Sequence, residues 1–291
     1  METPKIIALM AVRNEQWILE LSIGVALRWV DSIFLLDHAS EDDTPKILEH
    51  FMAKFPDRIE TDRLNTPEWD EMSHRQYMLE CGRRMGASHI AMIDADEILT
   101  ANLLSRIRAW VLALQPGQVL DLPMIAPWGS TTAYRDDHSV WGQAFLSTAF
   151  GDEGSLSWKP DSGYQHHHRT PYGVRNSIRP LHNKRQGGVM HLQFIDGDRL
   201  RWKHRKYKMT EVLRWPGREP ISQVDWKYSQ ALDESGLATT PVPEEWWDGY
   251  DRNKIKHEVE PWFKKECERM WSEHGMKRFK GLNLWGWPPR T

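Results

Sequence analysis

Three carboxylates, Asp94, Asp96 and Glu97, follow an apolar run at residues 90–93 that has the length and composition of a buried strand. Like charges this close together repel one another unless a cation neutralises them. Carboxylate oxygens are also the ligands that hard divalent cations prefer. In open α/β sheets, ligands bind outside the carboxyl ends of the strands. The pair Asp94 and Asp96 is therefore the best candidate for the chemical centre of this chain.

The elements that must position these carboxylates are predicted to alternate between strand and helix. Apolar runs predict strands at residues 5–12, 32–36, 58–64, 88–93 and 119–125. Helical patterns lie between them, at residues 16–28, 44–55, 71–85 and 102–114. Such alternation is typical of a mostly parallel sheet with helices on both faces. The polar loops that follow the strands then meet at one edge of the sheet.

The remaining sequence has a weaker pattern. Residues 128–154 contain four glycines and are predicted to be loop-rich, as a mobile lid or a platform for an acceptor. A strand-like run follows at residues 188–195. A helix is expected from residue 199 to Trp215, where Pro216 and Gly217 end it. Further helical stretches are expected at residues 225–233 and 254–271.

Composition is ordinary for a globular protein. The 291 residues, 40% of them hydrophobic and 27% charged, are enough for a full core. No run of about 18 apolar residues is present to cross a bilayer, and the first five residues lack the layout of a signal peptide. The two cysteines form neither a disulfide framework nor a zinc motif. These features predict a cytoplasmic protein without a membrane span.

Two departures from average composition bear on ligands. The 16 tryptophans suit sugar rings, nucleobases and apolar cores alike. Residues 162–218 contain 13 lysines and arginines and three acidic residues, a balance of +10 in a chain whose net charge is −3. Such a segment suits an anionic partner. A solvated helix face is the alternative interpretation, although it does not easily explain so large an excess.

Four stretches, taken in order, resemble a known family. They are VRNE at residues 12–15, LDHASEDDT at 36–44, HRQYML at 74–79 and DADE at 94–97. This order resembles the nucleotide-sugar-binding half of family 2 glycosyltransferases, which have the GT-A fold. The resemblance covers roughly the first 125 residues well and the rest only loosely. An Asp-x-Asp pair alone is a weak signal, whereas four elements at successive strand ends are a strong one.

The resemblance implies an α/β chain of GT-A type, with a mostly parallel central sheet flanked by helices and a helical, Trp-rich C-terminal region. Three regions are implied: a nucleotide-sugar-binding half at residues 1–125, an acceptor-side half with the histidine strand and the basic segment at 126–222, and a C-terminal helical extension at 223–291. The implied activity is metal-dependent transfer of a hexose or pentose, with inversion, from a nucleotide-diphosphate sugar, foremost a UDP-sugar, to an acceptor hydroxyl.

The resemblance also implies roles for individual residues. Asp37 matches the carboxylate that contacts the nucleobase, and His38 stands where a second Asp is usual. Asp94 matches the residue near the ribose and the donor sugar. Arg13 stands where an aromatic residue usually precedes Asn14. The expected nucleotide-sugar-binding residues are Val12, Arg13, Asn14, Glu15, Asp37, His38, Arg75, Asp94 and Ala95.

A divalent metal, Mn2+ or Mg2+, is implied at the same place. Asp96 matches its main protein ligand, and Asp94 is expected close by. His191 lies on a later apolar strand, where many GT-A enzymes have a histidine that completes the metal site. The other interpretation of His191 is a buried histidine that hydrogen-bonds to the backbone. A metal there would stabilise the leaving nucleoside diphosphate as a Lewis acid.

Residues for the diphosphate or the acceptor are expected downstream. Lys203, Lys206 and Tyr207 have helical spacing, and one or two cations are expected to hold the diphosphate. Residues 166–168 are three histidines; on a strand at most two of them share a face, which favours acceptor binding or packing over a zinc site. The expected diphosphate or acceptor residues are Arg169, Lys203, Lys206, Tyr207, His168 and Trp141.

A carboxylate base is expected because inverting transfer needs a group that takes a proton from the acceptor hydroxyl. No motif identifies it. Among the loop carboxylates at residues 136, 137, 152, 153 and 161, Asp137 and Asp161 are favoured, because they adjoin Trp141 and residues 164–169.

The acceptor and the class of protein have alternatives. The acceptor is a saccharide or, given the basic segment, a hydroxylated base in DNA, whose binding would weaken steeply with salt. A nucleotidyltransferase is a second class, but the loop after the first strand lacks the glycines that such enzymes use. A non-catalytic nucleic-acid-binding protein is a third. No motif indicates an oligomeric state.

Overall fold

The computed structural model describes residues 3–159, 166–257 and 261–288. The strands are β1 Ile6–Val12, β2 Ser32–His38, β3 Ile59–Leu64, β4 His89–Met92, β5 Glu97–Leu99, β6 Gln118–Ile125, β7 Ala133–Arg135, β8 Phe145–Gly151, β9 Asn176–Ile178, β10 Val189–His191 and β11 Thr239–Pro241. The α-helices are α1 Leu19–Ala26, α2 Thr44–Lys54, α3 Glu71–Arg84, α4 Leu104–Leu112, α5 Val140–Gln143, α6 Gly197–Arg214, α7 Ile221–Ser229 and α8 Trp262–Arg278. Short 3-10 helices are η1 Ala101–Leu103, η2 Lys184–Gln186, η3 Leu192–Ile195, η4 Gln230–Leu232, η5 Glu244–Trp247 and η6 Arg252–Lys254.

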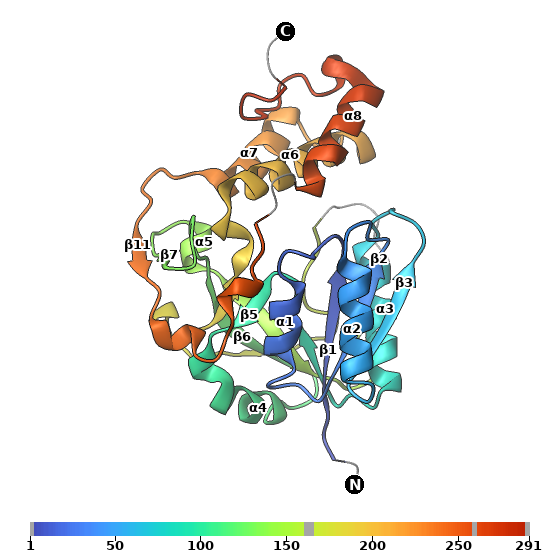
Figure 1. The fold of residues 1–291 in the computed structure, drawn as a ribbon, viewed down its shortest axis with the longest axis vertical. Coiled ribbons are helices and arrows are strands. Elements are labelled where there is room, and N and C mark those ends of the chain that lie inside the picture. Colours follow the sequence, from blue (N-terminus) through green and yellow to red (C-terminus); the bar gives the residue numbers. More distant parts are fainter. Residues whose placement is uncertain (1–2, 160–165, 258–260, 289–291) are drawn as a thin grey trace.

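One mixed sheet organises the described residues. Its strand order is β3-β2-β1-β4-β8-β6-β10-β5, with β9 beside β6. The strands β3, β2, β1 and β4 run parallel, and β8 is antiparallel to its neighbours β4 and β6. The predicted architecture, a mostly parallel central sheet flanked by helices with a helical C-terminal region, is confirmed (Figure 1).

Strand β1 shows why the apolar runs form buried strands. Successive side chains of a strand point to opposite faces of the sheet. Ile6 and Met10 pack on one face with residues of α1 and α2, while Ile7 and Leu9 pack on the other with residues of α3. Because helices cover both faces, the strand is apolar at every position rather than at every second one.

Residues 128–154 differ from the predicted loop-rich segment. They contain β7, α5 and the strand β8, which lies between β4 and β6 in the central sheet. The polar residues Ser147 and Thr148 interrupt the apolar run of β8 and hide it in the sequence. Tertiary contacts accommodate them, since the Ser147 hydroxyl donates a hydrogen bond of 2.8 Å to Asp121 on β6. The short strand β5 was not predicted either.

The C-terminal helices form a separate layer above the sheet. Figure 1 shows α6, α7 and α8 beside one another, on the side of the molecule away from the N-terminus. Their common core includes Met209 on α6 and Cys267 and Met270 on α8. The long helix α6 is capped at its N-terminus by Asp196, whose side chain accepts hydrogen bonds from the backbone N–H groups of residues 198 and 199. No helix in the described ranges is long and apolar enough to cross a membrane.

Candidate active site

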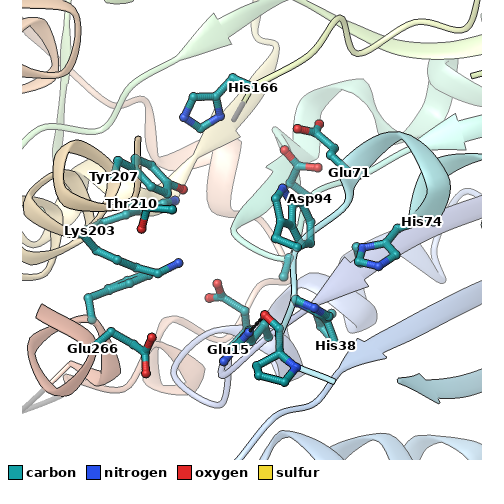
Figure 2. A pocket seen from close by; sticks show the side chains of 18 of the residues that line it. Glu15, His38, Glu71, His74, Asp94, His166, Lys203, Tyr207, Thr210 and Glu266 are labelled. Carbon is teal, nitrogen blue, oxygen red and sulfur yellow. Dashed lines mark hydrogen bonds between the residues drawn. The ribbon is translucent and has the colours of Figure 1, made fainter. Parts of the chain in front are cut away.

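A cavity of about 1200 Å3 lies between the carboxyl ends of the sheet strands and the helices α6, α7 and α8. Figure 2 shows side chains from both layers pointing into it. Most of the residues that the sequence singled out line this cavity. They are Val12, Arg13, Glu15, His38, Arg75, Asp94, Ala95, Asp96, Trp141, His191, Lys203, Lys206 and Tyr207.

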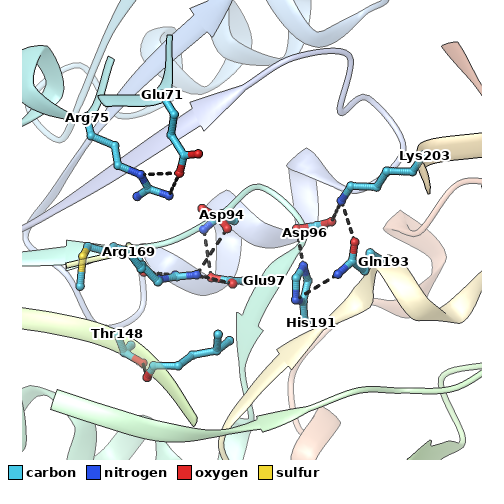
Figure 3. Close-up of polar contacts among 12 residues, drawn as sticks. Glu71, Arg75, Asp94, Asp96, Glu97, Thr148, Arg169, His191, Gln193 and Lys203 are labelled. Carbon is cyan, nitrogen blue, oxygen red and sulfur yellow. Dashed lines mark hydrogen bonds and ion pairs between the residues drawn. The ribbon is translucent and has the colours of Figure 1, made fainter. Parts of the chain in front are cut away.

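Asp96 is buried between His191 of β10 and Lys203 of α6 (Figure 3). The antiparallel pairing of β5 with β10 sets His191 opposite Glu97, next to Asp96 in the chain. As a result His191 Nε2 lies 3.3 Å from Asp96 Oδ1. On the other side, Lys203 of α6 places its Nζ 3.3 Å from Asp96 Oδ2. Burial by itself would raise the pKa of Asp96, but Lys203 and His191 outweigh burial and hold this pKa well below its usual value.

Arg169 pairs with the other two carboxylates of the cluster, those of Glu97 and Asp94 (Figure 3). Its guanidinium donates to both oxygens of Glu97, at 2.6 and 2.5 Å, and lies 3.4 Å from Asp94 Oδ2. Glu97 is buried and also accepts a hydrogen bond from the backbone N–H of Asp94 at 3.1 Å. Glu97 therefore begins β5 and holds the loop in shape, rather than only opening a turn.

Asp94 and Asp96 consequently differ in their ion-pair partners and in their exposure to solvent. Asp94 pairs with Arg169 and has 47% of its side chain exposed, whereas Asp96 pairs with Lys203 and His191 and has 6% exposed. Cations of the chain itself thus neutralise the repulsion that the sequence showed at residues 94–97. Repulsion alone is no reason for a metal at this site.

The fit of a divalent metal rests on Asp96 and His191. Two neighbouring ligands of an octahedral Mg2+ or Mn2+ ion, each about 2.1 Å from the metal, lie about 3 Å apart, close to the 3.3 Å between Asp96 Oδ1 and His191 Nε2. Across the part of the chain that the structure describes, no group of three His, Cys, Asp or Glu side chains is arranged to hold a metal. These two ligands fit an ion that takes its other ligands from phosphate oxygens and water. Asp94 does not complete a three-residue set.

Glu15 links the β1 loop to the basic helix. Arg199 Nη2 lies 3.0 Å from Glu15 Oε2, and the Trp17 indole donates to the same carboxylate at 2.5 Å. Burial raises the pKa of Glu15 to about 7, against the opposing effect of Arg199. Its neighbour Asn14 does not line the cavity: the Asn14 side chain accepts from the backbone N–H of Glu41 at 2.7 Å and shapes the loop.

At the end of β2, His38 faces the cavity and Asp37 does not. Asp37 is buried and binds Arg63 at 2.6 Å and the backbone N–H of Ser40 at 3.0 Å. His38 Nε2 lies 2.8 Å from the carbonyl oxygen of Glu68, which can only accept, so Nε2 carries the hydrogen and Nδ1 a lone pair. Burial lowers the pKa of His38 to about 4, which keeps the ring neutral.

Three other predicted residues lie outside the cavity lining. Asp137 is buried against Arg135, 2.5 Å away, and its side chain also accepts from the backbone N–H of Ser139 at 2.9 Å. Arg169 stands behind Asp94 as a support, and His168 is exposed. Residues 166–168 do not form a strand. Asp161 lies outside the described residues.

Arg13 and Lys206 form a pair of like charges on the cavity wall. Arg13 Cζ lies 5.2 Å and Lys206 Nζ 4.7 Å from the centre of the Trp262 ring. Within the described residues, neither cation has a carboxylate within 4 Å; Arg13 donates to the carbonyl of Pro67 instead. Burial, and after it Arg13, lower the pKa of Lys206 to about 8. Glu266 of α8 lines the same cavity and partly offsets these two charges. Without a carboxylate in direct contact, the two cations still suit an anionic ligand.

Several cavity residues were missed by the sequence reasoning. The helix side contributes Tyr228 and Trp262, Trp69 comes from the segment between β3 and α3, and Glu71 and His74 come from the first turn of α3. Glu71 opens α3 and pairs with Arg75 at 2.8 Å. Trp69 and Glu71 lie just before the HRQYML stretch and His74 begins it, so their position in the sequence was the one available signal. Tyr228 and Trp262 have no comparable signal because helix docking alone brings them to the cavity.

The basic segment is largely neutralised by acids of the same chain. Ten of its 13 cations lie within 4 Å of a carboxylate, namely Arg169, Arg175, Arg179, Lys184, Arg185, Arg199, Arg201, Lys203, Lys208 and Arg218. Arg205 and Arg214 donate to backbone carbonyl groups. The local charge of +10 is thus used mainly to join parts of the chain.

No protein-family model matches the chain, and no curated protein matches its sequence. Among solved structures it is similar to S. aureus TarS 1-349, with 8% identity, 92% of this chain and 79% of that chain covered, and a TM-score of 0.44. It is also similar to mannosyltransferase PcManGT from Pyrobaculum calidifontis in complex with GDP-Man and Mn2+ (12% identity, 94% and 77% covered, TM-score 0.45) and to GalNAc-T7 with UDP, GalNAc and Mn2+ (11%, 84% and 56%, 0.39). These TM-scores lie below 0.5, so the function of this chain must be inferred from the residues of its own site.

Proposed function

We propose that this chain is a glycosyltransferase of the GT-A type, similar to family 2, that transfers a sugar from a nucleoside-diphosphate sugar to an acceptor hydroxyl. One observation supports it above the others. The cavity combines a buried aspartate, Asp96, with a histidine and a lysine at 3.3 Å each, at the carboxyl edge of a mostly parallel sheet. A diphosphate needs such a mixed set of metal ligands and fixed positive charge.

The nucleotide is proposed to lie along the ends of β1 and β2. His38 Nδ1 is buried and has no hydrogen-bond partner among the described residues. Its lone pair suits a nucleobase that donates an N–H group, as the N3–H of uracil does, once a turn of the ring exposes it, and this favours a UDP-sugar. Arg13 at the end of β1 and Lys206 of α6 lie around the Trp262 ring and suit the phosphates. Asp94, with half its side chain exposed, is proposed to bind the ribose or the donor sugar.

Asp96 and His191 are proposed to hold Mn2+ or Mg2+ together with the diphosphate. When bound, the metal supplies a Lewis acid that stabilises the departing nucleoside diphosphate. Lys203 supplies a second, permanent charge at the same place, because Asp96 raises its pKa in spite of burial. The carboxylate of Asp96 thereby fixes the position of Lys203 before the donor arrives, which lowers the reorganisation needed for catalysis.

A saccharide is the proposed acceptor rather than DNA. The basic segment favoured DNA in the sequence, but ten of its 13 cations are bound to carboxylates of the chain. The cavity wall formed by Trp141, Tyr207 and Tyr228 offers ring faces and hydroxyl groups, which suit a sugar. Transfer is proposed to invert the anomeric carbon, as the resemblance to family 2 implies.

Thermal unfolding with a panel of donors tests the proposal. UDP-glucose, UDP-N-acetylglucosamine and GDP-mannose are each added with Mn2+ or with EDTA. A ligand that binds only the folded state stabilises it by about 2.7 kcal/mol at 100 times its Kd. We expect one UDP-sugar to raise the melting temperature with Mn2+ and much less with EDTA. The variant Asp96→Asn should lose this effect, while Asp198→Asn, at an exposed site, should keep it.

Stabilisation of Asp96→Asn equal to that of the wild type, or no stabilisation of the wild type by any donor, would contradict the proposal. The acceptor is tested separately with duplex DNA. Binding that falls steeply between 50 and 200 mM salt would favour the DNA acceptor instead.

A further inference from the structure

We propose that His166 is the general base that takes the proton from the acceptor hydroxyl. The inference rests on the proposed function and names a residue that acts in the same cavity. The sequence reasoning expected a carboxylate in this role, with Asp137 as one of two favoured candidates. Asp137 is bound to Arg135 and lies outside the cavity lining, which argues against it as the base, and the other candidate, Asp161, lies outside the described residues.

The chain itself holds His166 close to the proposed donor sugar. Arg169 follows three residues later, and its guanidinium is anchored on Glu97 and on the backbone carbonyl of Met92, with Asp94 at 3.4 Å. Three residues span at most about 10 Å when fully extended. The His166 ring is therefore tethered to the wall that carries Asp94.

The opposite side of His166 contacts the helical layer. Its ring centre lies 4.9 Å from that of Tyr207 on α6 and 5.7 Å from that of Tyr228 on α7, both with edge-on or tilted geometry. Figure 2 shows the ring at the margin of the cavity between Tyr207 and the wall of Asp94 and Glu71. An acceptor that rests on the two tyrosines would thus lie beside the imidazole.

His166 has a lone pair to spare, whereas the carboxylates of this part of the cavity are engaged. Among the described residues, His166 makes ring contacts but no hydrogen bond or ion pair. By contrast Glu71 is bound to Arg75, and Asp96 to Lys203 and His191. Asp94 is partly neutralised by Arg169.

The charges around His166 keep its ring neutral. His166 is exposed at the rim of the cavity, but the surrounding atoms of the helical layer desolvate its ring and lower its pKa to about 4. Lys227 of α7 acts in the same direction, as do Lys203 and Lys206 of α6, while Glu211 of α6 opposes them. A neutral imidazole has one unprotonated nitrogen at pH 7. Its basicity is then similar to that of a carboxylate, the group that commonly serves as a base.

The step balances as follows. The oxygen of the acceptor hydroxyl forms a bond to the anomeric carbon, and its proton passes to the free nitrogen of His166. The bond between the anomeric carbon and the phosphate oxygen breaks, and its electron pair leaves with the nucleoside diphosphate. The imidazolium then returns the proton to water.

Hydrolysis of the donor tests this role, because water then replaces the acceptor and must also lose a proton. Release of the nucleoside diphosphate, UDP from UDP-glucose and UDP-N-acetylglucosamine and GDP from GDP-mannose, is measured with wild type, His166→Ala, His166→Gln and the control His138→Ala, an exposed histidine. We expect both His166 variants to lose about 100- to 10,000-fold in rate. Their stabilisation by the donor should be unchanged, His138→Ala should match the wild type, and added imidazole should restore part of the rate in His166→Ala.

Two results would overturn the assignment. The first is a His166→Ala rate within about threefold of the wild type while the donor still stabilises both. The second is a large loss in Asp161→Asn or Glu71→Gln without a loss in His166→Ala. If no donor stabilises the wild type, the proposed function fails and this inference fails with it. If a donor stabilises both proteins but the rate of His166→Ala is unchanged, only this inference fails, so the two failures are distinguishable.

Discussion

The ammonium group of Lys203 lies 3.3 Å from Asp96 Oδ2 and 2.8 Å from Gln193 Oε1. This contact joins α6 of the helical layer to the loop between β4 and β5, across 107 residues of sequence. The acidic end of the sheet and the basic helix, which are separate features in the sequence, thus form one side of a single cavity.

Replacing Lys203 tests whether this contact serves catalysis. In Lys203→Met the cavity keeps its shape approximately but loses a fixed positive charge beside the phosphates. Removal of one such preorganised group costs about 100- to 1,000-fold in kcat. Steady-state kinetics with the donor that binds in the thermal panel should show this loss, whereas Lys280→Met, at an exposed site, should retain the wild-type rate. An unchanged kcat in Lys203→Met would remove Lys203 from the mechanism.

Arg169→Met tests the support behind the aspartates. The change leaves the Glu97 carboxylate, whose side chain is 1% exposed, without its partner. Loss of one partner of a buried ion pair costs about 3–5 kcal/mol. Urea denaturation should show this loss of free energy of unfolding. The matched control is Arg175→Met, which breaks a pair in which the arginine is 63% exposed and should cost about 1 kcal/mol or less. Equal losses in the two variants would contradict the assignment.

Lys206→Met should stabilise the free protein and weaken donor binding. The unfolded chain has a lysine pKa near 10.5 and the folded protein one of about 8, so the unfolded state binds more protons between pH 8 and 10.5. The stability of the wild type should therefore rise with pH across this window. Below it, the variant should be more stable by about 1–3 kcal/mol, because it removes a partly buried cation that has no carboxylate within 4 Å among the described residues.

Donor binding should respond in the opposite direction. Loss of a charged contact to phosphate should weaken binding of UDP about 10- to 100-fold at pH 7, and wild-type affinity should also fall as the pH rises through about 8. Calorimetric titration with UDP at pH 7 and pH 9 measures both effects. A variant that is less stable at pH 7 and binds UDP as tightly as the wild type would refute this assignment.

His38 is expected to select the nucleobase. Because its Nδ1 carries a lone pair with no partner among the described residues and its pKa is about 4, the ring favours a base with an N–H donor at any pH above about 5. UDP methylated at uracil N3 lacks this donor and should bind the wild type about tenfold more weakly than UDP. His38→Phe should bind the two compounds similarly. The same affinity of the wild type for both would exclude this contact.

The order of elements in the first 125 residues was predictable because the strands there are buried on both faces and read as continuous apolar runs. The strand β8 was not predictable, because the polar residues Ser147 and Thr148 interrupt its apolar pattern. In the sheet the Ser147 hydroxyl is satisfied by its hydrogen bond to Asp121, a contact that the sequence pattern does not report. At β2 the sequence pointed to Asp37 beside the nucleobase. The structure turns His38 to the cavity instead, because neighbouring side chains of a strand face opposite ways and a shift of one residue exchanges them.

Local apolar patterns and chain direction were enough to predict that Arg13, Glu15, Asp94 and Asp96 lie near one edge of a parallel sheet. Which cation pairs with which carboxylate follows from the packing of the whole chain. Arg169 meets Glu97 across 72 residues, Lys203 meets Asp96 across 107, and Arg199 meets Glu15 across 184. These pairs depend on how the helical layer docks on the sheet, and no local pattern reports a contact between residues so far apart in the chain.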